Sequence, residues 1–299
     1  MDIFFTLLIK WQGESTDAVN ACAVSPSGDS IVSASMDGTL KLWDMQTGEE
    51  RMTLRGHTRV VCECAVSPSG DWIVSASMDG TLRIWDMQTG EERMMLLGDE
   101  HEVFSCAVNP SGDWIVSGST DGTLKLWDAH TGRKLRTLRG HTGWVTGCAI
   151  APSGRSLVSA SIDATLRIWD LQTGEARMTL RGHEQKHWVN ACAISPLEDW
   201  IVSASSDMTL KVWDTRTGKD QLTLRGHTGD VRKCAISPQG DCIVSASADK
   251  TVKVWDTRTG ACLTTLVMEG AMNVCAFCPD GEHIIAGGAS GIYRLRLVR

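Results

Sequence analysis

A repeated segment constrains this chain more than any other feature. Residues 67–86 read SPSGDWIVSASMDGTLRIWD, and closely similar segments occupy 25–44, 109–128, 151–170, 195–214 and 237–256, with a degraded copy at 278–297. The Trp-Asp pairs that end the first six copies are 42, 42, 42, 44 and 42 residues apart. Such a regular repeat decides the fold, because each copy forms one small unit and neighbouring units bury each other's apolar faces.

Each copy has the pattern of a four-stranded antiparallel sheet. Four runs favour β-strands, at 60–67, 72–77, 82–86 and 93–96, and PSGD, MDGT and MQTGEE turns separate them. Short runs rich in Val and Ile between Gly, Asp and Ser turns indicate an all-β protein. Four strands in about 42 residues match one blade of a β-propeller, and stacking blades in a closed ring buries both faces of each sheet. The sequence therefore predicts a seven-bladed β-propeller.

Closure of the ring depends on the N-terminal residues. The chain ends at Arg299, directly after the third strand of the seventh unit, so that unit has no fourth strand of its own. Residues at about 3–12, IFFTLLIKWQ, lie just before the first strand of unit one, where a fourth strand belongs. We predict that this segment pairs with the C-terminal unit and closes a single domain over 1–299. The expected repeats are about 13–55, 56–97, 98–139, 140–181, 182–225, 226–266 and 267–299.

Composition narrows the classes of partner. The formal net charge of −7 and the pI of about 5.6 make a nucleic-acid role unlikely, since general nucleic-acid binders are usually basic. The apolar run near the N-terminus is too short to span a membrane and lacks the features of a signal peptide. We therefore expect no membrane contact.

Cysteine usage indicates a reducing compartment. Seven of the eleven cysteines occupy the same repeat position inside a strand, which is typical of small buried apolar residues rather than disulfide partners. Cys275 and Cys278 form a CxxC pair, but alternation along a strand places them on opposite faces, and no second pair completes a metal site. We expect a cytoplasmic protein with no cofactor and no metal.

The motif set resembles the WD-repeat β-propeller family along essentially the whole chain. It consists of a Gly-His, then SPSGD, then SAS-x-D-G-T and a Trp-Asp, at a spacing of 42 residues. The resemblance implies a seven-bladed ring that acts as a scaffold for other proteins, usually without catalysis. The array of repeats also resembles the regular WD arrays attached to signalling NTPases. The chain itself has no GxxxxGK[ST] motif, which is the phosphate-binding motif of such NTPases.

The resemblance further implies a hydrogen-bonded tetrad in each complete blade, made of a loop His, a strand Ser, a turn Asp and the Trp. Trp can only donate and Asp can only accept, whereas Ser and His do both, so the four side chains can be satisfied in a row. The SAS triplet offers two serines, and either one can serve as the relay. The matching residues are His57, Ser75, Asp79 and Trp85; His141, Ser159, Asp163 and Trp169; His183, Ser203, Asp207 and Trp213; and His227, Ser245, Asp249 and Trp255.

Three units depart from this pattern. Unit one has no His near Ser15, and unit seven has Arg296-Leu297 where Trp-Asp is expected. Unit three has Asp99 at the His position, and His101 is a candidate substitute for the missing imidazole. The Ser-His-Asp sets also invite a hydrolase interpretation. Four equivalent sets, each tied to a Trp, argue against it, because an active site needs one nucleophile in one cleft.

Comparison of the repeats with one another shows where the chain varies. The residue before each turn Asp is Met36, Met78, Thr120, Ile162, Ser206, Ala248 or Ala289, and the residue aligned after Gly-His is Ala18, Val60, Glu102, Trp144, Trp188, Asp230 or Ala271. Both positions are expected at the same end of each blade, so together they ring one mouth of the central channel.

This variable end is the predicted partner-binding site, because Trp and Met are common in protein interfaces. The candidate residues are Met36, Arg59, Val60, Met78, Glu102, Trp144, Ile162, Trp188, Ser206, Asp230 and Arg232. The alternative for the two tryptophans is that they fold down over neighbouring blades. A second set, Trp72, Trp114 and Trp200, starts the second strands near the opposite rim, where packing between blades and self-association are both possible roles.

The sequence favours a non-catalytic scaffold that binds a protein or peptide at the variable end. One alternative is a recently amplified or designed repeat protein without a dedicated partner, since residues 25–50 and 67–92 are nearly identical. Another is a module that senses a small ligand or peptide within a larger signalling protein, because the mouth of a ring is a natural pocket.

Overall fold

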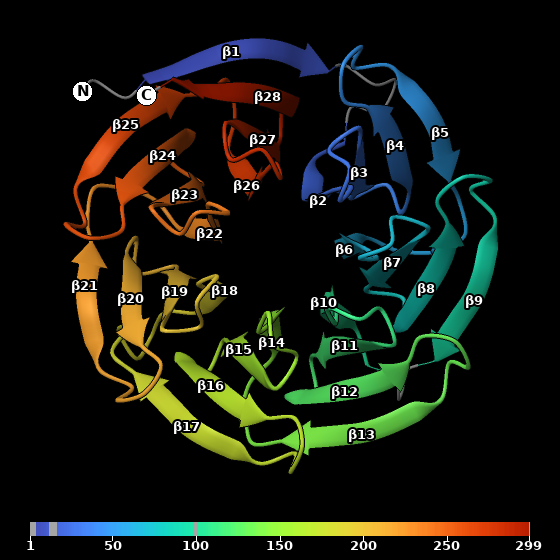
Figure 1. Cartoon of the computed structure of the whole chain (residues 1–299), viewed down its shortest axis with the longest axis horizontal. Coiled ribbons are helices and arrows are strands. Elements are labelled where there is room, and N and C mark those ends of the chain that lie inside the picture. Colours follow the sequence, from blue (N-terminus) through green and yellow to red (C-terminus); the bar gives the residue numbers. More distant parts are fainter. Residues whose placement is uncertain (1–3, 12–16, 98–100, 299) are drawn as a thin grey trace.

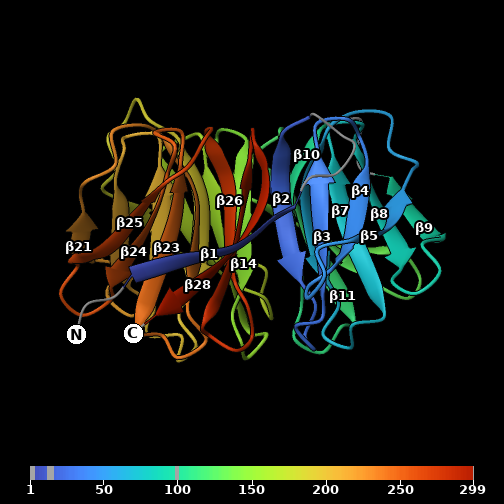
Figure 2. The same ribbon diagram turned by 90° about the horizontal axis from the view of Figure 1, so that it is seen from above.

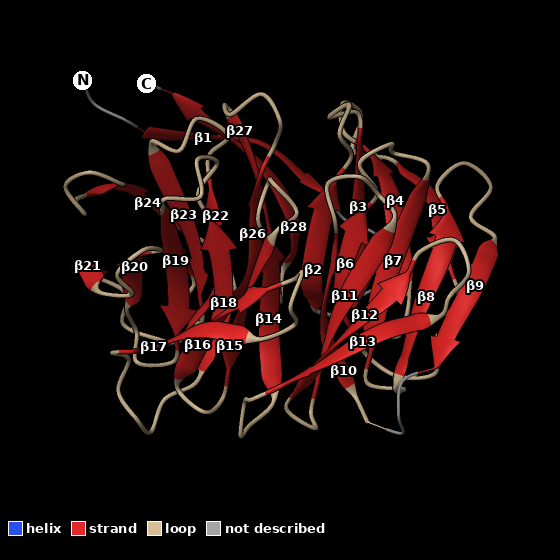
Figure 3. Cartoon of the chain, turned by 60° about the horizontal axis from the view of Figure 1, so that its bottom comes forward, coloured by secondary structure: helices blue, strands red, loops and turns tan. Residues whose placement is uncertain are grey.

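Seven four-stranded sheets stand around a central axis (Figure 1). The computed structural model describes residues 4–11, 17–97 and 101–298, and all the regular elements in these ranges are β-strands (Figure 3). Within each sheet the neighbouring strands are antiparallel. The predicted fold, an all-β propeller with seven blades, is confirmed.

Blades 1 to 6 follow one another along the chain, each with its strands in sequential order from the axis outward (Figure 1). Blade 1 contains β2 (Val19–Val24), β3 (Ser30–Ser35), β4 (Leu40–Asp44) and β5 (Glu50–Leu54). Blade 2 contains β6 (Val61–Val66), β7 (Trp72–Ser77), β8 (Thr81–Asp86) and β9 (Glu92–Leu97). Blade 3 contains β10 (Val103–Val108), β11 (Trp114–Ser119), β12 (Thr123–Asp128) and β13 (Lys134–Arg139). Blade 4 contains β14 (Val145–Ile150), β15 (Ser156–Ser161), β16 (Thr165–Asp170) and β17 (Ala176–Arg181). Blade 5 contains β18 (Val189–Ile194), β19 (Trp200–Ser205), β20 (Leu210–Asp214) and β21 (Asp220–Leu224). Blade 6 contains β22 (Val231–Ile236), β23 (Cys242–Ser247), β24 (Thr251–Asp256) and β25 (Cys262–Val267).

Blade 7 is completed by both ends of the chain. It contains β26 (Met272–Phe277), β27 (His283–Gly288) and β28 (Gly291–Val298), and its outer strand is β1 (Phe4–Trp11). β1 runs antiparallel to β28, from Phe4 opposite Val298 to Trp11 opposite Ile292. Figure 1 shows β1 outside β28, in the place that the other blades fill with their own last strand. The predicted closure of the ring by the N-terminal segment is confirmed.

The pairing register corrects one alignment made from the sequence. In blade 7, Leu295 lies opposite Ile284, as Trp43 lies opposite Ile31 in blade 1. Leu295-Arg296, and not Arg296-Leu297, therefore takes the place of Trp-Asp. The reason is the turn between β27 and β28, which is one residue shorter than its counterparts and shifts the following strand.

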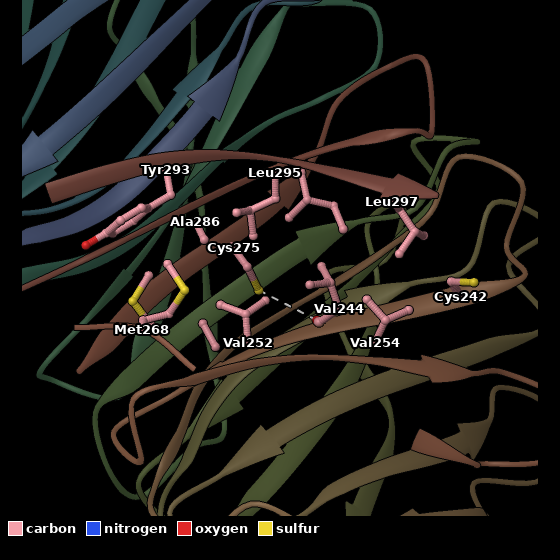
Figure 4. Packing of buried hydrophobic residues seen from close by; sticks show 13 residues of the cluster. Cys242, Val244, Val252, Val254, Met268, Cys275, Ala286, Tyr293, Leu295 and Leu297 are labelled. Carbon is pink, nitrogen blue, oxygen red and sulfur yellow. Dashed lines mark hydrogen bonds between the residues drawn. The ribbon is translucent and has the colours of Figure 1, made fainter. Parts of the chain in front are cut away.

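The core consists of seven apolar clusters, one between each pair of neighbouring blades. The Trp of a blade is buried against the preceding blade, as Trp85 is against Leu40 and Leu54 of blade 1. Between blades 6 and 7 the cluster contains Leu295 and Tyr293 and no Trp (Figure 4). The second strands are buried on both faces because a blade covers each side, which explains their near-continuous apolar and small residues.

The turns gather at the two ends of the ring (Figure 2). At one end lie the PSGD turns and the TG turns, joined in blades 1 to 6 by one backbone hydrogen bond, such as the one from Met45 N to Asp29 O at 2.9 Å; in blade 7, Leu297 of β28 donates the equivalent bond to Glu282 O. We call this end the opposite face. The other end carries the turns between the second and third strands and the loops that lead from one blade to the next.

Candidate functional site

We call the end of the ring that carries the turns between the second and third strands the variable mouth. There the two variable positions of each repeat are hydrogen-bonded to each other. In each blade the backbone N–H of the residue before the turn Asp donates to the carbonyl oxygen of the residue that precedes the first strand, over 2.9–3.1 Å. The pairs are Met36–Ala18, Met78–Val60, Thr120–Glu102, Ile162–Trp144, Ser206–Trp188, Ala248–Asp230 and Ala289–Ala271. The sequence placed these positions at the same end, and the structure shows that they form seven paired stations around the channel.

Beneath these stations, four blades hold a complete tetrad. In blade 2, Trp85 Nε1 donates to Ser75 Oγ at 2.8 Å, Ser75 Oγ lies 2.7 Å from His57 Nε2, and His57 Nδ1 lies 2.8 Å from Asp79 Oδ2. Blades 4, 5 and 6 repeat this chain of contacts within 0.1 Å. Because Trp only donates and the carboxylate only accepts, the protons run from Trp through Ser to His and on to Asp.

The serine of the relay is the first of the SAS triplet. The second serine, Ser77 in blade 2, donates instead to the carbonyl oxygen of Arg59 at 3.3 Å. The Ser75 hydroxyl is fully buried and engaged by two partners. The same holds for its counterparts in blades 4 to 6. These hydroxyls are therefore not placed as nucleophiles, and the tetrads serve to fix the turn and loop that form the variable mouth.

The electrostatics of the tetrad agree with a neutral imidazole beside a carboxylate. Burial lowers the pKa of His57 below its ordinary value, although Asp79 opposes this shift. Burial alone raises the pKa of Asp79, but hydrogen bonds from Thr81 and His57 outweigh it and lower the pKa to about 2. His227 and Asp249 in blade 6 show the same two directions for the same reasons.

In a blade without the tetrad His, the turn Asp has other hydrogen-bond partners. In blade 3, Asp121 accepts from Thr123 at 2.7 Å and from the Lys125 ammonium at 3.2 Å, whereas His101 is exposed. Among the described residues no hydrogen bond joins His101 to Asp121, so the proposed substitution is wrong, because a lysine on the strand reaches the carboxylate from within the blade. Ser15 and Asp99 lie outside the described residues.

Blade 1 replaces part of its tetrad by an aromatic stack. Trp43 Nε1 still donates to Ser33 Oγ at 2.8 Å. The ring of Trp11, from the closing strand β1, stacks on Trp43 with centroids 6.3 Å apart and planes 13° from parallel. The strand that closes the ring thus also supports the first blade.

The mouth is most apolar on blades 4 and 5. Trp144 and Trp188 occupy equivalent stations there and are 42% and 53% exposed. Trp144 stacks on Phe104 of blade 3, with centroids 5.4 Å apart, so it folds partly over its neighbour while keeping one side free. Met36 on blade 1 is 52% exposed, whereas Val60, Met78, Ile162 and Ser206 are half-buried. The predicted apolar residues therefore do not contribute equally.

Two of the four charged candidates at the mouth, Arg59 and Glu102, form an ion pair. Arg59 bridges blades 2 and 3, because its guanidinium lies 2.7 Å from Glu102 and also donates to Met78 O at 2.7 Å. Arg232 donates to the Asn273 amide oxygen on blade 7. Asp230 is exposed beside the apolar stations of blade 5. Asp230 and Arg232 are thus the charged candidates that no ion pair within the described ranges neutralises, and Asp230 directly precedes the first strand of the blade next to Trp188.

Sequence reasoning missed Met208, which is 43% exposed in the mouth turn of blade 5. Its φ is +66°, a conformation that glycine adopts freely and that costs other residues on the order of 1 kcal/mol. Blades 1 to 3 have Gly at this position, with φ near +80°. The replacement of Gly by Met after a turn Asp is the sequence signal that identifies this residue.

Sequence reasoning also missed an ion pair inside the channel. Glu63 on β6 and Lys233 on β22 belong to blades 2 and 6, yet their carboxylate and ammonium groups are in contact. The innermost strands line the axis (Figure 1), so this pair crosses the channel below the mouth. The signal is the residue before the repeated Cys, which is charged only in these two units.

Two other interpretations from the sequence concern packing and bound metals. Trp72, Trp114 and Trp200 pack against the clusters between blades, and Trp72 is buried. Cys275 and Cys278 lie in different clusters, on opposite sides of blade 7. Across the described residues no group of His, Cys, Asp and Glu is arranged to hold a metal ion, and no helix is long and apolar enough to cross a membrane.

Comparison with known proteins agrees with this architecture. The family model for "WD domain, G-beta repeat" matches six segments, at residues 5–44, 48–86, 91–128, 132–170, 174–214 and 218–256. Among curated proteins, the chain is similar to the nuclear distribution protein PAC1 of Ajellomyces capsulatus, with 47% identity over 47 residues, and to nudF of Aspergillus flavus, with 51% identity over 45 residues. These matches cover 15–16% of this chain and only 10% of the length of either relative. The six matched segments span most of the chain, which therefore belongs to the WD-domain, G-beta repeat family.

Proposed function

We propose that the protein is a non-catalytic interaction scaffold that binds a protein or peptide segment at the variable mouth, over blades 4 and 5. The observation that carries this proposal is the exposure of Trp144 and Trp188 at equivalent stations of neighbouring blades. Trp supplies a large rigid contact area, and residues of this kind carry much of the binding energy in protein interfaces.

The neighbourhood of the two tryptophans supports an apolar contact. Met208 lies in the same turn as Ser206, whose hydroxyl accepts from Trp188 N at 2.8 Å, so this hydrogen bond joins the turn to the Trp188 backbone. Its side chain is exposed despite the backbone strain of its positive φ. Methionine adapts its shape to different apolar partners. The partner segment is therefore expected to present an aliphatic or aromatic side chain to blades 4 and 5.

Charge adds a second element of recognition. Asp230 on blade 6 is exposed next to this apolar area, whereas Arg59 and Glu102 already neutralise each other. A basic group on the partner, close to its apolar side chain, would pair with Asp230. Such a rim charge mainly affects the rate of association and the choice of partner.

The absence of catalysis forms part of the proposal. The Ser, His and Asp side chains that resemble a hydrolase triad are buried in four equivalent tetrads, and each serine accepts a hydrogen bond from a Trp. A substrate has no access to these hydroxyls in the folded ring. The tetrads then serve the scaffold, because they hold the loops that display the binding residues.

A peptide selection tests the proposal. Peptides are selected from a random library against the wild-type protein, and their affinities are compared by calorimetry for wild type, Trp188→Ala and Asp230→Lys. We expect each substitution to weaken binding by roughly tenfold or more, because each removes a central contact. Leu197→Ala, which changes an exposed apolar residue of the opposite face, is the matched control.

Two outcomes would contradict the proposal. The first is a set of selected peptides whose affinity is unchanged in both mouth variants, since their site would then lie elsewhere. The second is a failure to select any peptide, which would favour a repeat protein without a dedicated partner. Equal melting temperatures for all variants show that the fold is intact.

A further inference from the structure

A groove between blades 3 and 4 opens at the opposite face, at the other end of the ring from the variable mouth. Its volume is about 810 Å³, which is within the usual range of ligand sites. Trp114, Leu135 and Leu171 supply apolar lining, Arg136, Arg155 and Arg177 supply positive charge, and Asp170 supplies one carboxylate. The groove thus combines apolar side chains with three guanidinium groups and one carboxylate in a protein whose net charge is −7.

Arg155 reverses a charge that the other repeats keep. It is the last residue of its PSGD-type turn, and its carbonyl oxygen accepts from Leu171 N, just as Asp29 O accepts from Met45 N in blade 1. The equivalent residues in the other blades are all acidic: Asp29, Asp71, Asp113, Asp199, Asp241 and Glu282. The turn itself therefore does not require arginine.

Arg136 is a second departure on the facing blade. It lies opposite Leu126 in the sheet, at the place where Met52, Met94 and Met178 lie in blades 1, 2 and 4. Its Nη1 reaches blade 4 and donates to Leu171 O at 3.3 Å and Gln172 O at 3.1 Å. An apolar contact between blades has thus been replaced by a cation at the wall of the groove.

The equivalent groove between blades 1 and 2 has the opposite character. It is smaller, about 460 Å³, and three aspartates, Asp29, Asp71 and Asp86, face two arginines. Those arginines are already paired, Arg51 with Asp44 and Arg93 with Asp86, each at 2.5 Å. In the blade 3–4 groove, within the described part of the chain, no carboxylate forms an ion pair with Arg136 or Arg155. The same architecture thus lines one groove with three arginines and one aspartate, and the other with two arginines and three aspartates.

We propose that the blade 3–4 groove binds an acidic peptide segment that carries one large apolar side chain. Arginine forms paired, charge-assisted hydrogen bonds with carboxylates, which is the contact that Arg155 and Arg136 lack in the free protein. The apolar side chain lies on Trp114 and Leu135, where it removes exposed apolar surface from water. An extended nucleic acid is the less favoured occupant, because the net charge of −7 repels a long polyanion. This site is independent of the variable mouth.

Fluorescence anisotropy with a labelled pentapeptide, Asp-Glu-Trp-Glu-Asp, tests the proposal. We expect saturable binding that weakens with added salt, since exposed charges are screened. Arg155→Asp and Arg136→Met should each weaken binding by roughly tenfold, which corresponds to about 1.4 kcal/mol. Both variants restore residues that other blades carry at the same position, so they are expected to fold. Arg258→Asp, the same charge change in an exposed turn of blade 6, is the matched control and should bind as wild type does.

Further probes decide between occupants. A peptide with Ala in place of Trp should bind more weakly, and one with Lys in place of each acidic residue should not bind. Trp144→Ala should leave binding unchanged, which separates this site from the variable mouth. Tighter binding of an oligouridylate with the same dependence on Arg155 would overturn the proposal in favour of nucleic acid. Peptide affinity that is equal in wild type, Arg155→Asp and Arg136→Met would also overturn it.

Discussion

The ion pair that crosses the channel allows a quantitative test of how the ring is held together. Glu63 and Lys233 come from β6 and β22, on blades 2 and 6, and no main-chain hydrogen bond joins these strands in the described sheets. The other five blades carry small or neutral residues at the same position: Ala21, Ser105, Gly147, Ala191 and Val274. Glu63→Ala, Lys233→Ala and the double variant are therefore sterically acceptable and change little besides the charges.

The structure gives the expected size of the effect. The Glu63 and Lys233 side chains are 13% and 27% exposed, so water screens their attraction only in part. Burial opposes the charge on Lys233, but the Glu63 carboxylate outweighs it and raises the lysine pKa above its ordinary value. A contacting pair attracts by about 4 kcal/mol at an effective dielectric constant near 20, and the loss of hydration offsets much of that energy. We expect each single variant to lose about 2 kcal/mol, because it leaves one charge unpaired in the channel.

The double variant should lose less than either single variant, since it leaves no charge unpaired. The coupling energy from the double-mutant cycle is then about 2 kcal/mol or more in favour of the pair. Urea unfolding at low salt is the suitable assay, because guanidinium chloride would itself screen the pair. Losses that add to within about 0.5 kcal/mol would refute the reasoning, as they would show that the two side chains do not stabilise each other.

Three further predictions concern closure, pH and thiol reactivity. Trp11→Ala should destabilise the protein to urea by about 3 kcal/mol, because it removes a buried ring that stacks on Trp43, whereas Phe4→Ala, at the exposed end of the same strand, should have little effect. Stability should fall as the pH is lowered from about 7 to 5, because burial holds the pKa of His57 and His227 below their values in the unfolded chain. The unfolded chain therefore binds protons more readily than the folded one over this range. A urea midpoint that does not change between pH 7 and pH 5 would contradict this. Ellman's reagent should react rapidly with the thiol of Cys262, because this cysteine is exposed, and with all eleven thiols after denaturation. A Cys262→Ser variant that keeps a rapid phase would contradict this.

Much of the fold was predictable because it follows from local periodicity. Alternating Val and Ile between Gly and Asp turns defines a strand, and a fixed spacing of 42 residues repeats the blade. Even the pairing of β1 with β28 could be inferred, since one unit lacked a strand and the N-terminus held a spare one. The register of β28 was predicted incorrectly at Leu295, because a turn shortened by one residue moves every later contact and leaves only a weak trace in a degraded repeat.

The candidate site was harder to predict because it depends on contacts between blades. Arg59 was predicted as a partner-binding residue, but Glu102 of the next blade neutralises its charge. A charge before the repeated Cys marks Glu63 and Lys233 in the sequence, but these residues are 170 positions apart and only the closed ring brings them into contact. The sequence shows Met208 at a position where blades 1 to 3 have Gly, but the exposure of its side chain at the mouth depends on the conformation of the turn. Such features require the closed ring and do not follow from a single repeat.

The construction of the two ends explains how nearly identical repeats can display different side chains. At the variable mouth and at the opposite face, each pair of turns is joined by a backbone N–H and a backbone C=O, as in Ser206–Trp188 and Leu171–Arg155. The side chains at these stations take no part in that bond, so Trp, Asp or Arg can replace its counterpart without loss of the link. At the variable mouth of blades 2, 4, 5 and 6, the buried tetrads also hold the turns in place, whatever side chains the turns display. The ring thus separates the residues that determine its stability from those that are free to vary, and the departures at Trp188 and Arg155 are expected to affect binding and to leave folding unchanged.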